Sequence, residues 1–209
     1  MRKLLPISIV IIFFTSACTR DDSTAPLILI QPDAHAPHYR TIPFVDPGCE
    51  VADDYSCADA IDLQISNNVD VNKYGTYNIM YTATDEAGNI NEYNRPVDII
   101  LPISDYYDFA YSAYDTCTSG NYFYTGLAQD CDCPDDKVIF GNISNFGPNA
   151  TFPLPINGQY NHMITLDTTK LAVTFFGTGV MSPAADTIFW EFVIMDSIST
   201  DACRSVWIK

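Results

Sequence analysis

Turn-forming residues interrupt this chain about every 8–12 residues, and this spacing limits the fold more than any other feature. The segments between the turns are short and rich in Ile, Val, Thr, Tyr and Phe, which favour extended strands. The 13 Pro and 10 Gly provide many of the turns. Within residues 103–209, no window of 11 residues shows the periodicity of an amphipathic helix. The pattern therefore predicts an all-β protein built from antiparallel sheets.

Composition excludes several classes of protein. The 209 residues include 26 Asp and Glu against 10 Lys and Arg, which gives a formal net charge of -16. So acidic a chain is a poor partner for nucleic acid, because phosphate binding needs clustered basic residues. A hydrophobic content of 47% excludes intrinsic disorder. The sequence contains no P-loop, dinucleotide-binding, zinc-protease or nucleophile-elbow motif, so we expect no cofactor and no enzyme of those classes.

The N-terminal segment predicts export. Arg2 and Lys3 precede an apolar run over 4–14, which is too short to span a bilayer, and Ser16-Ala17-Cys18 follows. This arrangement resembles a bacterial lipoprotein signal over 1–17, which implies a lipid on Cys18. The alternative is an ordinary signal peptide that leaves Cys18 as a plain thiol. We expect a lipid-anchored protein at the outer membrane or cell surface.

Residues 18–25 read as a polar tether. Its Asp21-Asp22 pair resembles the acidic tags of surface-exported lipoproteins, although a solvated linker explains the pair equally well. A lipid anchor alone attaches such a protein to the membrane without any protein segment in the bilayer.

The segment 26–102 alternates short strands with turns and predicts a small β-sandwich. Thr41–Val45 is expected at a sheet edge because Pro43 cannot donate a ladder hydrogen bond. The other expected strands cover 27–30, 61–65, 74–83 and 90–101.

Three ordered motifs in this segment identify a resemblance. They are Asp46-Pro47-Gly48, the run Lys73-Tyr74-Gly75-Thr76-Tyr77, and Thr84-Asp85-Glu86-Ala87-Gly88-Asn89. Together they resemble the bacterial immunoglobulin-like repeat of secreted and surface proteins, which also occurs in some insecticidal crystal toxins. The resemblance implies an immunoglobulin-like sandwich that acts as a spacer, with Tyr77 as the tyrosine that locks one corner.

Residues 103–209 predict a second domain, joined to the first near 104–108. The eight expected strands cover 109–116, 122–127, 137–146, 150–154, 159–166, 171–177, 187–195 and 204–208. Short connections between successive strands predict an up-and-down antiparallel β-barrel or sandwich, closed to protect its edges.

This second domain also carries a resemblance. The segment Ile143–Gly147 and the final Asp201-Ala202-Cys203 with Trp207 are similar to the C-terminal domain that often follows this repeat in small lipoproteins of gut-type Gram-negative bacteria. In that group a cysteine near the first strand pairs with one that enters the last strand. The resemblance therefore implies a bridge between Cys117 and Cys203.

The remaining cysteines leave alternatives open. Cys49 and Cys57 are close enough in sequence for a local disulfide. Cys131 and Cys133 then remain, either as a Cys-x-Cys bridge or as half of a metal site that lacks partners. Six cysteines allow 15 connectivities.

We expect no metal site. The turn acids could suggest calcium but lack the spacing of a known calcium loop, so we interpret them as solvated: Asp53, Asp54, Asp85 and Glu86. His35 and His38 form a pair without further zinc ligands. His162, alone in the second domain, is read as a structural or solvent-facing residue.

Aromatic residues are the best indication of binding. Tyr122, Tyr124, Trp190 and Trp207 are candidates for stacking on a ligand, because exposed Tyr and Trp bind sugars and anchor protein contacts. The alternative is that alternate aromatics fill the barrel core.

Three functions therefore compete. The first is a monomeric, non-catalytic binding or adhesion accessory for a glycan, host polymer or protein, with the first domain as spacer. The second is a purely structural envelope lipoprotein, and the third is a hydrolase with an unrecognised carboxylate pair. An aromatic-lined cleft at the barrel mouth would favour binding, and a filled barrel without a cleft would argue against binding and hydrolysis.

Overall fold

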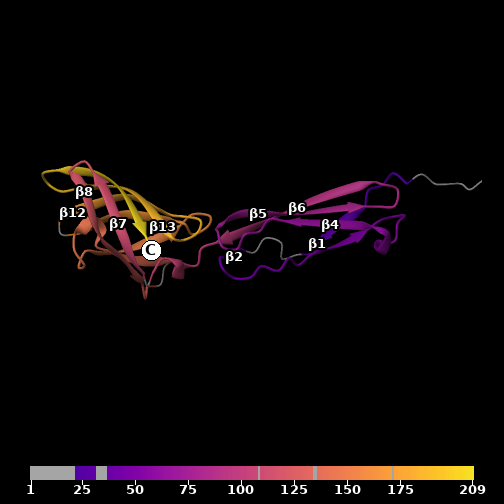
Figure 1. The fold of residues 1–209 in the computed structure, drawn as a ribbon, viewed down its shortest axis with the longest axis horizontal. Coiled ribbons are helices and arrows are strands. Elements are labelled where there is room, and N and C mark those ends of the chain that lie inside the picture. The colour runs from indigo at the N-terminus through magenta and orange to yellow at the C-terminus, as the bar shows by residue number, and fades with distance from the viewer. Residues whose placement is uncertain (1–21, 32–36, 108, 134–135, 171) are drawn as a thin grey trace, which may run out of the picture.

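The computed structural model describes residues 22–31, 37–107, 109–133, 136–170 and 172–209. Two β domains follow one another along an elongated molecule, with the start of the described chain at one end and a barrel at the other (Figure 1). The signal segment and Cys18 lie outside the described residues. No helix in the described ranges is long and apolar enough to cross a membrane.

The first domain is a sandwich of two sheets. Strands β1 (Leu27–Ile30) and β3 (Cys49–Ala52) form the smaller sheet. The larger sheet has the order β2-β6-β5-β4, with β2 (His38–Tyr39), β6 (Ile90–Ile100), β5 (Gly75–Thr84) and β4 (Asp62–Asn67). A core of seven buried residues, including Ile28 from the smaller sheet and Ile79 from the larger one, lies between them.

The expected edge strand over 41–45 is wrong. This stretch is irregular, and the chain pairs with β6 earlier, through the two residues of β2. Thr41 has a positive φ of 66° and Pro43 has no N–H, so neither residue suits a ladder. Pro96 is tolerated within β6 because β2 pairs only with Ile99 and Ile100 on that side.

The second domain is a closed eight-stranded barrel in which all neighbouring strands are antiparallel, so the predicted fold class is confirmed. The strands run in sequence order and β14 closes against β7. Their bounds are β7 (Phe109–Cys117), β8 (Gly120–Asp130), β9 (Lys137–Gly141), β10 (Thr151–Asn157), β11 (Met163–Lys170), β12 (Val173–Met181), β13 (Thr187–Met195) and β14 (Thr200–Ile208).

Two expectations about the barrel strands need correction. The predicted strand over 137–146 ends at Gly141, where the short 3₁₀ turn η3 (Ile143–Asn145) begins. The predicted strand over 159–166 begins only at Met163, because the chain turns at Gly158, which has a φ of 88°. The residues that follow β9 and those that precede β11 include positive φ angles, for example at Asn142 and Asn161, and a strand excludes such angles.

The motifs of the first domain have structural roles. The hydroxyl of Tyr77 donates to the Lys73 carbonyl at 3.0 Å, which forms the expected tyrosine corner. Asp46 of the Asp-Pro-Gly turn accepts from Tyr81 and from Arg95, each at 2.6 Å, and the Arg95 side chain is only 1% exposed. The Asp-Pro-Gly turn is therefore held by a buried ion pair that the sequence did not reveal.

Several contacts fix the two domains against each other. Arg40 of the sandwich donates two hydrogen bonds, of 2.8 and 3.0 Å, to the carboxylate of Asp105 in the short connector η2 (Ile103–Asp105). Tyr74 donates its hydroxyl to the Met181 carbonyl at 2.9 Å and its N–H to the Pro183 carbonyl. His162 lies outside the strands and packs its ring on Tyr74, 5.0 Å between centroids. The joint is therefore an ordered interface.

Candidate functional site

The described residues of the barrel interior pack into one buried core cluster that is rich in aromatic rings. Trp190 and Trp207 are 1% and 0% exposed, with their ring centroids 5.5 Å apart, and Tyr124 is 6% exposed. These three predicted stacking residues are therefore core residues, and their assignment to a ligand is wrong. The cause is strand alternation: each of the three lies on the inward face of its strand. Gly126 and Gly179 leave space that the rings of Trp207 and Trp190 occupy.

Tyr122 is the fourth candidate and the only one of the set that reaches solvent. It faces inward like Tyr124 but lies at the end of β8, where 38% of it remains exposed. Its hydroxyl is 3.0 Å from Oγ of Ser119 in the β7–β8 turn.

The outer surface of β12, β13, β14, β7 and β8, which we call the wall face, carries an ordered set of side chains. Directly opposed residues on the five strands form an apolar row: Val180, Phe189, Val206, Tyr114 and Phe123. The rings of Phe189, Tyr114 and Phe123 are 52%, 48% and 76% exposed. The next outward-facing residues, two positions away on each strand, form a polar row parallel to the first: Thr178, Glu191, Arg204, Thr116 and Asn121.

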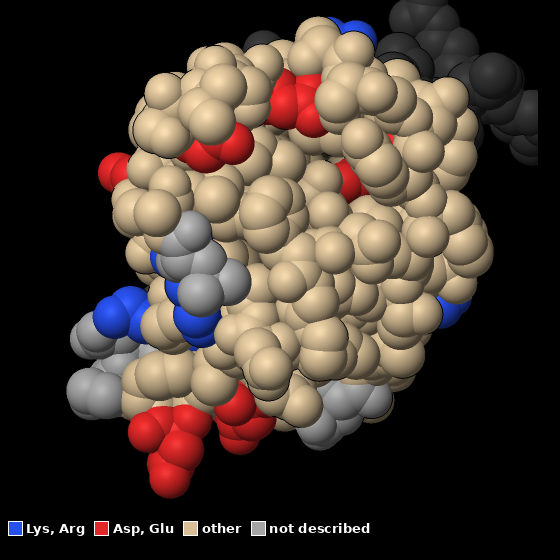
Figure 2. All heavy atoms as spheres, turned by 90° about the vertical axis from the view of Figure 1, so that its left-hand side faces the viewer, with Lys and Arg blue, Asp and Glu red and all other residues tan. Residues whose placement is uncertain are grey.

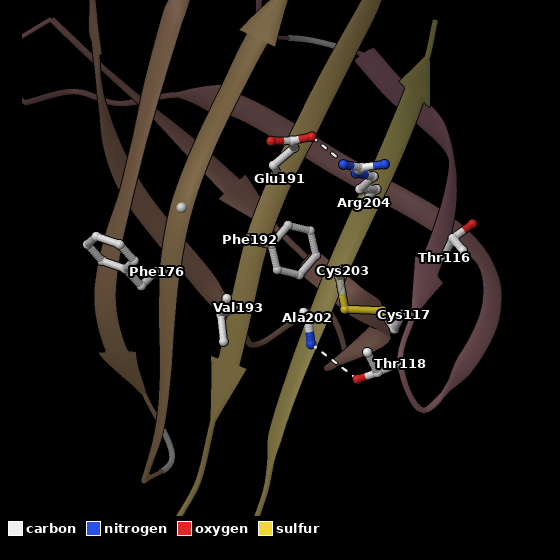
Figure 3. Close-up of a pocket in the computed structure, with 11 residues that line it drawn as sticks. Thr116, Cys117, Thr118, Phe176, Glu191, Phe192, Val193, Ala202, Cys203 and Arg204 are labelled. Atoms are coloured by element: carbon white, nitrogen blue, oxygen red, sulfur yellow. Dashed lines mark hydrogen bonds and ion pairs between the residues drawn. A yellow bond between two sulfur atoms is a disulfide. The ribbon is translucent and has the colours of Figure 1, made fainter.

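Beyond the polar row, the wall face is hollowed into a mostly apolar groove of about 540 Å³. Phe176, Val193 and Ala202 line it, and Phe176 is 57% exposed. Figure 3 shows Glu191 and Arg204 reaching toward each other above the groove, with Nε and Oε1 at 3.1 Å. It also shows the disulfide between Cys117 and Cys203 at the seam where β14 meets β7.

A second recess lies at the distal end of the barrel, the end away from the sandwich. We call it the mouth hollow; it has a volume of about 320 Å³. Two aromatic, two polar and two acidic residues define its character: Tyr122, Phe146, Asn145, Ser199, Asp196 and Asp201. Figure 2 looks onto this end, whose surface is largely uncharged, with Asp and Glu atoms in separate small groups.

The backbone beside the mouth hollow is held in unusual conformations. Asn142, Ser144 and Asn145 have positive φ values of 59°, 53° and 61°. The Asn142 side chain fixes this loop by accepting from Gly147 N at 2.7 Å and donating to the Thr125 carbonyl at 2.8 Å. Three such residues within four positions cost free energy, and they mark a segment whose shape is imposed by its surroundings.

A buried polar chain supports this loop from below. Ser144 N donates to the Tyr124 hydroxyl at 2.9 Å, and that hydroxyl donates to Asp115 at 2.9 Å. Asp115 is fully buried, and burial raises its pKa, although the hydrogen bond from Tyr124 offsets part of this effect. Tyr124 therefore contributes to the distal end by holding the loop instead of touching a ligand.

Both acids of the mouth hollow are held as carboxylates. Backbone N–H groups of Ile198 and Ser199 donate to Asp196 and lower its pKa. Burial opposes ionisation of Asp201, but hydrogen bonds from Ser119 and Thr118 outweigh it and lower the pKa. Glycoside hydrolysis needs one carboxyl group with a raised pKa, so this pair does not have the electrostatics of that reaction.

The cysteines divide into bonded and free. Cys117 and Cys203 form a disulfide between directly opposed residues of β7 and β14, and Cys131 is bonded to Cys133. The local bridge expected between Cys49 and Cys57 is not formed, and both are free thiols. Cys49 packs against the sandwich core from β3, whereas Cys57 is exposed beyond the turn that follows this strand.

Two groups of residues have the donor atoms for a metal. In the first, Asp22, Asp53 and Asp54 bring carboxylate oxygens within 4.8 Å of one another at the N-terminal end of the sandwich. The second joins Asp201 to Cys117 and Cys203, whose sulfur atoms are already used in the disulfide.

The other metal candidates from the sequence do not join these groups. Asp85, expected as a solvated acid, is only 5% exposed and accepts from Asn89 N at 2.8 Å, so that interpretation is wrong for this residue. His38 contacts the Ile42 carbonyl at 2.8 Å, and His35 lies outside the described residues.

The sequence did not identify the wall face, because Phe123, Tyr114 and Phe189 can be told from core aromatics only by strand parity. Once Tyr124 and Trp207 are known to face inward, alternation places Phe123 and Val206 outside. The sequence showed the alternation along each strand, but it did not show which of the two sets of residues faces inward.

Comparison with known proteins adds to the geometry. A search of the solved structures found the lipoprotein BT2262 from Bacteroides thetaiotaomicron, with 18% identity over 87% of this chain and 98% of that chain and a TM-score of 0.33. A search of the curated proteins found no match. Residues 41–99 match the sequence model of the family described as "Bacterial surface protein, Ig-like domain", and a domain of this kind fits a location in the cell envelope. Over residues 41–99 the chain is therefore similar to the immunoglobulin-like domain of bacterial surface proteins.

Proposed function

We propose that this protein is a lipid-anchored, non-catalytic accessory of the cell surface that binds a neutral glycan chain on the wall face of its barrel. The immunoglobulin-like domain acts as the spacer between anchor and barrel. The observation that carries the proposal is the register that places an exposed apolar row beside a polar row across five strands.

The chemistry of the two rows suits a sugar polymer. Exposed aromatic rings pack on the apolar faces of sugar rings, while Glu191, Arg204 and Thr116 offer donors and acceptors to hydroxyl groups. Five strands spaced by about 4.8 Å give a platform of roughly 19 Å, long enough for several sugar units. A filled interior leaves the outer surface for binding.

The shape of the molecule supports the role of the first domain. Asp22 lies near the turn after β5, where its carbonyl accepts from Asn89, while Tyr74 contacts the barrel just before β5 begins. The ten residues of β5 therefore separate these points by roughly 33 Å. If the molecule stands upright on an anchor at Cys18, the barrel lies farther from the membrane than Asp22 by roughly this length.

Charge favours a neutral ligand. The chain carries a net charge of -16, which repels anionic polymers at long range. On the wall face itself, Glu191 and Arg204 form an ion pair and leave the surface near neutrality.

The direct test is glycan-array binding by residues 19–209, a soluble form that contains every described residue. We expect binding to neutral glycan chains, and the substitutions Tyr114→Ala, Phe123→Ala and Phe189→Ala should each weaken it about fivefold or more. Tyr93→Ala, which removes a partly exposed aromatic from the sandwich, is the matched control. Equal loss in the control, or no binding to any neutral glycan, would refute the proposal.

The anchor has its own test. Replacement Cys18→Ser should move the full chain from the membrane fraction to the soluble fraction, because the described chain offers no spanning helix. A variant that stays in the membrane fraction would exclude lipidation as the means of attachment.

A further inference from the structure

We infer that the mouth hollow binds a small organic cation, with an ammonium group placed between the aromatic rings of Tyr122 and Phe146 and the carboxylate of Asp196. This site is separate from the wall face, and neither proposal depends on the other.

The hollow combines the two kinds of group that recognise ammonium ions. Tyr122 and Phe146 are 38% and 39% exposed on its lining, and aromatic rings attract cations through their negative faces. Asp196 and Asp201 line the same recess and add two negative charges. Among the residues that line it, all of which are described, there is no Lys or Arg to neutralise them.

Asp196 has an oxygen free for a ligand. Its Oδ1 atom accepts from Ile198 N and Ser199 N at 2.7 Å each, and these bonds fix the carboxylate at the β13–β14 turn. Within the described ranges, Oδ2 has no protein partner. Asp201 differs because hydroxyl or N–H groups of Thr118 and Ser119 bond to both of its oxygens.

Contacts within the chain fix the shape of the mouth hollow. Its volume of about 320 Å³ lies at the lower end of the usual range for ligand pockets, which suits a single small molecule. The loop over 142–147 is fixed by its own side chains and by Tyr124, so little order has to be gained on binding.

An organic cation fits this lining better than an inorganic one. Calcium and magnesium prefer several oxygen ligands at short distance, whereas here one carboxylate is largely occupied and two aromatic rings share the recess. A primary amine and a quaternary ammonium share the required charge, and they differ in their ability to donate hydrogen bonds.

The test is an NMR titration of the soluble form, residues 19–209, at low ionic strength. The probes are choline for a quaternary ammonium, spermidine for primary amines, calcium for an inorganic cation and glucose for a neutral ligand. We expect choline, spermidine or both to shift backbone signals of Tyr122, Phe146 and Ser199, and their relative affinities identify the preferred kind of ammonium.

Variants test the assigned contacts. Asp196→Asn keeps the hydrogen bonds at Oδ1 and should weaken binding about tenfold. Phe146→Leu keeps an apolar side chain and should weaken it about threefold or more. Asp167→Asn removes an exposed charge elsewhere on the barrel, and Phe109→Leu removes an aromatic from the opposite end. Both controls should bind like the original protein.

Three outcomes would overturn the inference. They are the absence of shifts at the hollow with both amines at millimolar concentration, the same shifts with calcium alone, and equal weakening by Asp167→Asn and Asp196→Asn. Because the glycan assay uses other residues, its failure would not affect this result.

Discussion

The barrel and the sandwich are both built mainly from antiparallel strands, but the side chains that they bury differ in kind and number. The barrel closes its sheet and fills it with rings such as Trp190, Trp207 and Phe140. The sandwich leaves its sheets open, has a core of seven buried residues, and holds its turn with the buried ion pair of Arg95 and Asp46. Closure removes the unpaired edges that favour aggregation, so the barrel can expose aromatic residues on its wall at lower risk.

The largest difference should appear when a ring is removed from the barrel core. Trp207 is fully buried against Tyr111, Tyr124, Phe140 and Trp190, and a closed sheet cannot collapse into the space it leaves. Trp207→Ala should lower the free energy of unfolding of the barrel by about 5 kcal/mol.

Urea unfolding can measure this effect in one domain at a time. Both tryptophans lie in the barrel, so Trp190 fluorescence reports on that domain alone in the variant. Circular dichroism follows both domains and should show the sandwich transition unchanged. An unaltered Trp190 midpoint would mean that the core tolerates the loss.

The next largest loss of stability is expected where β14 meets β7, at the disulfide that joins the two strands. The disulfide between Cys117 and Cys203 joins residues 86 apart in sequence. Replacing both cysteines by Ala should destabilise the barrel by about 4.6 kcal/mol in the chain-closure account. Reducing agent should lower the midpoint of the original protein strongly and that of the double variant only slightly, because the variant keeps just the short bridge between Cys131 and Cys133. Replacement of Cys131 and Cys133, which close a much shorter loop, is the control and should cost far less.

The stability of the sandwich depends on the ion pair between Arg95 and Asp46. Arg95→Ala leaves Asp46 without its cation and should cost the sandwich about 3 kcal/mol, the low end for broken buried pairs because Asp46 is partly exposed. The sandwich transition followed by circular dichroism should shift, whereas tryptophan fluorescence should not. A shift in fluorescence instead would show that the joint couples the two domains into one unfolding unit.

The smallest predicted effect is a dependence of the barrel's stability on pH, which arises from Asp115. Burial raises the pKa of Asp115, so the unfolded chain ionises this group more readily than the folded barrel does. The resulting penalty is full above the folded pKa and disappears as the pH falls through that pKa to the unfolded value. Asp115→Asn should therefore stabilise the barrel at neutral pH, and this advantage should shrink on acidification. A pH-independent difference between the two proteins would contradict the assignment.

Much of this architecture could be predicted from the residues. Alternation and turn chemistry predicted the all-β fold and located most strands, because those signals are local. Three separated motifs were enough for the immunoglobulin-like resemblance over the first domain. The pairing of Cys117 with Cys203 was implied by resemblance, and the structure places the two residues opposite each other.

The candidate sites could not be predicted in the same way. Tyr122, Phe123 and Tyr124 are consecutive, yet one lines the mouth hollow, one lies on the wall face and one is buried. A shift of one residue in register would exchange these roles, and register depends on partners far away in sequence. The loop over 142–147 was equally hidden, because its positive φ values depend on bonds to β8.

The position of β14 has a consequence for the timing of folding. This strand is the last of the barrel strands in sequence, and it is the partner that closes β7. The barrel therefore cannot close until every strand from β7 to β14 is available, because its closing pair brings together Cys117 and Cys203, which are 86 residues apart. During that interval the rings destined for the interior have no finished enclosure. A chain that lacks β14 (Thr200–Ile208) would stay permanently at this stage.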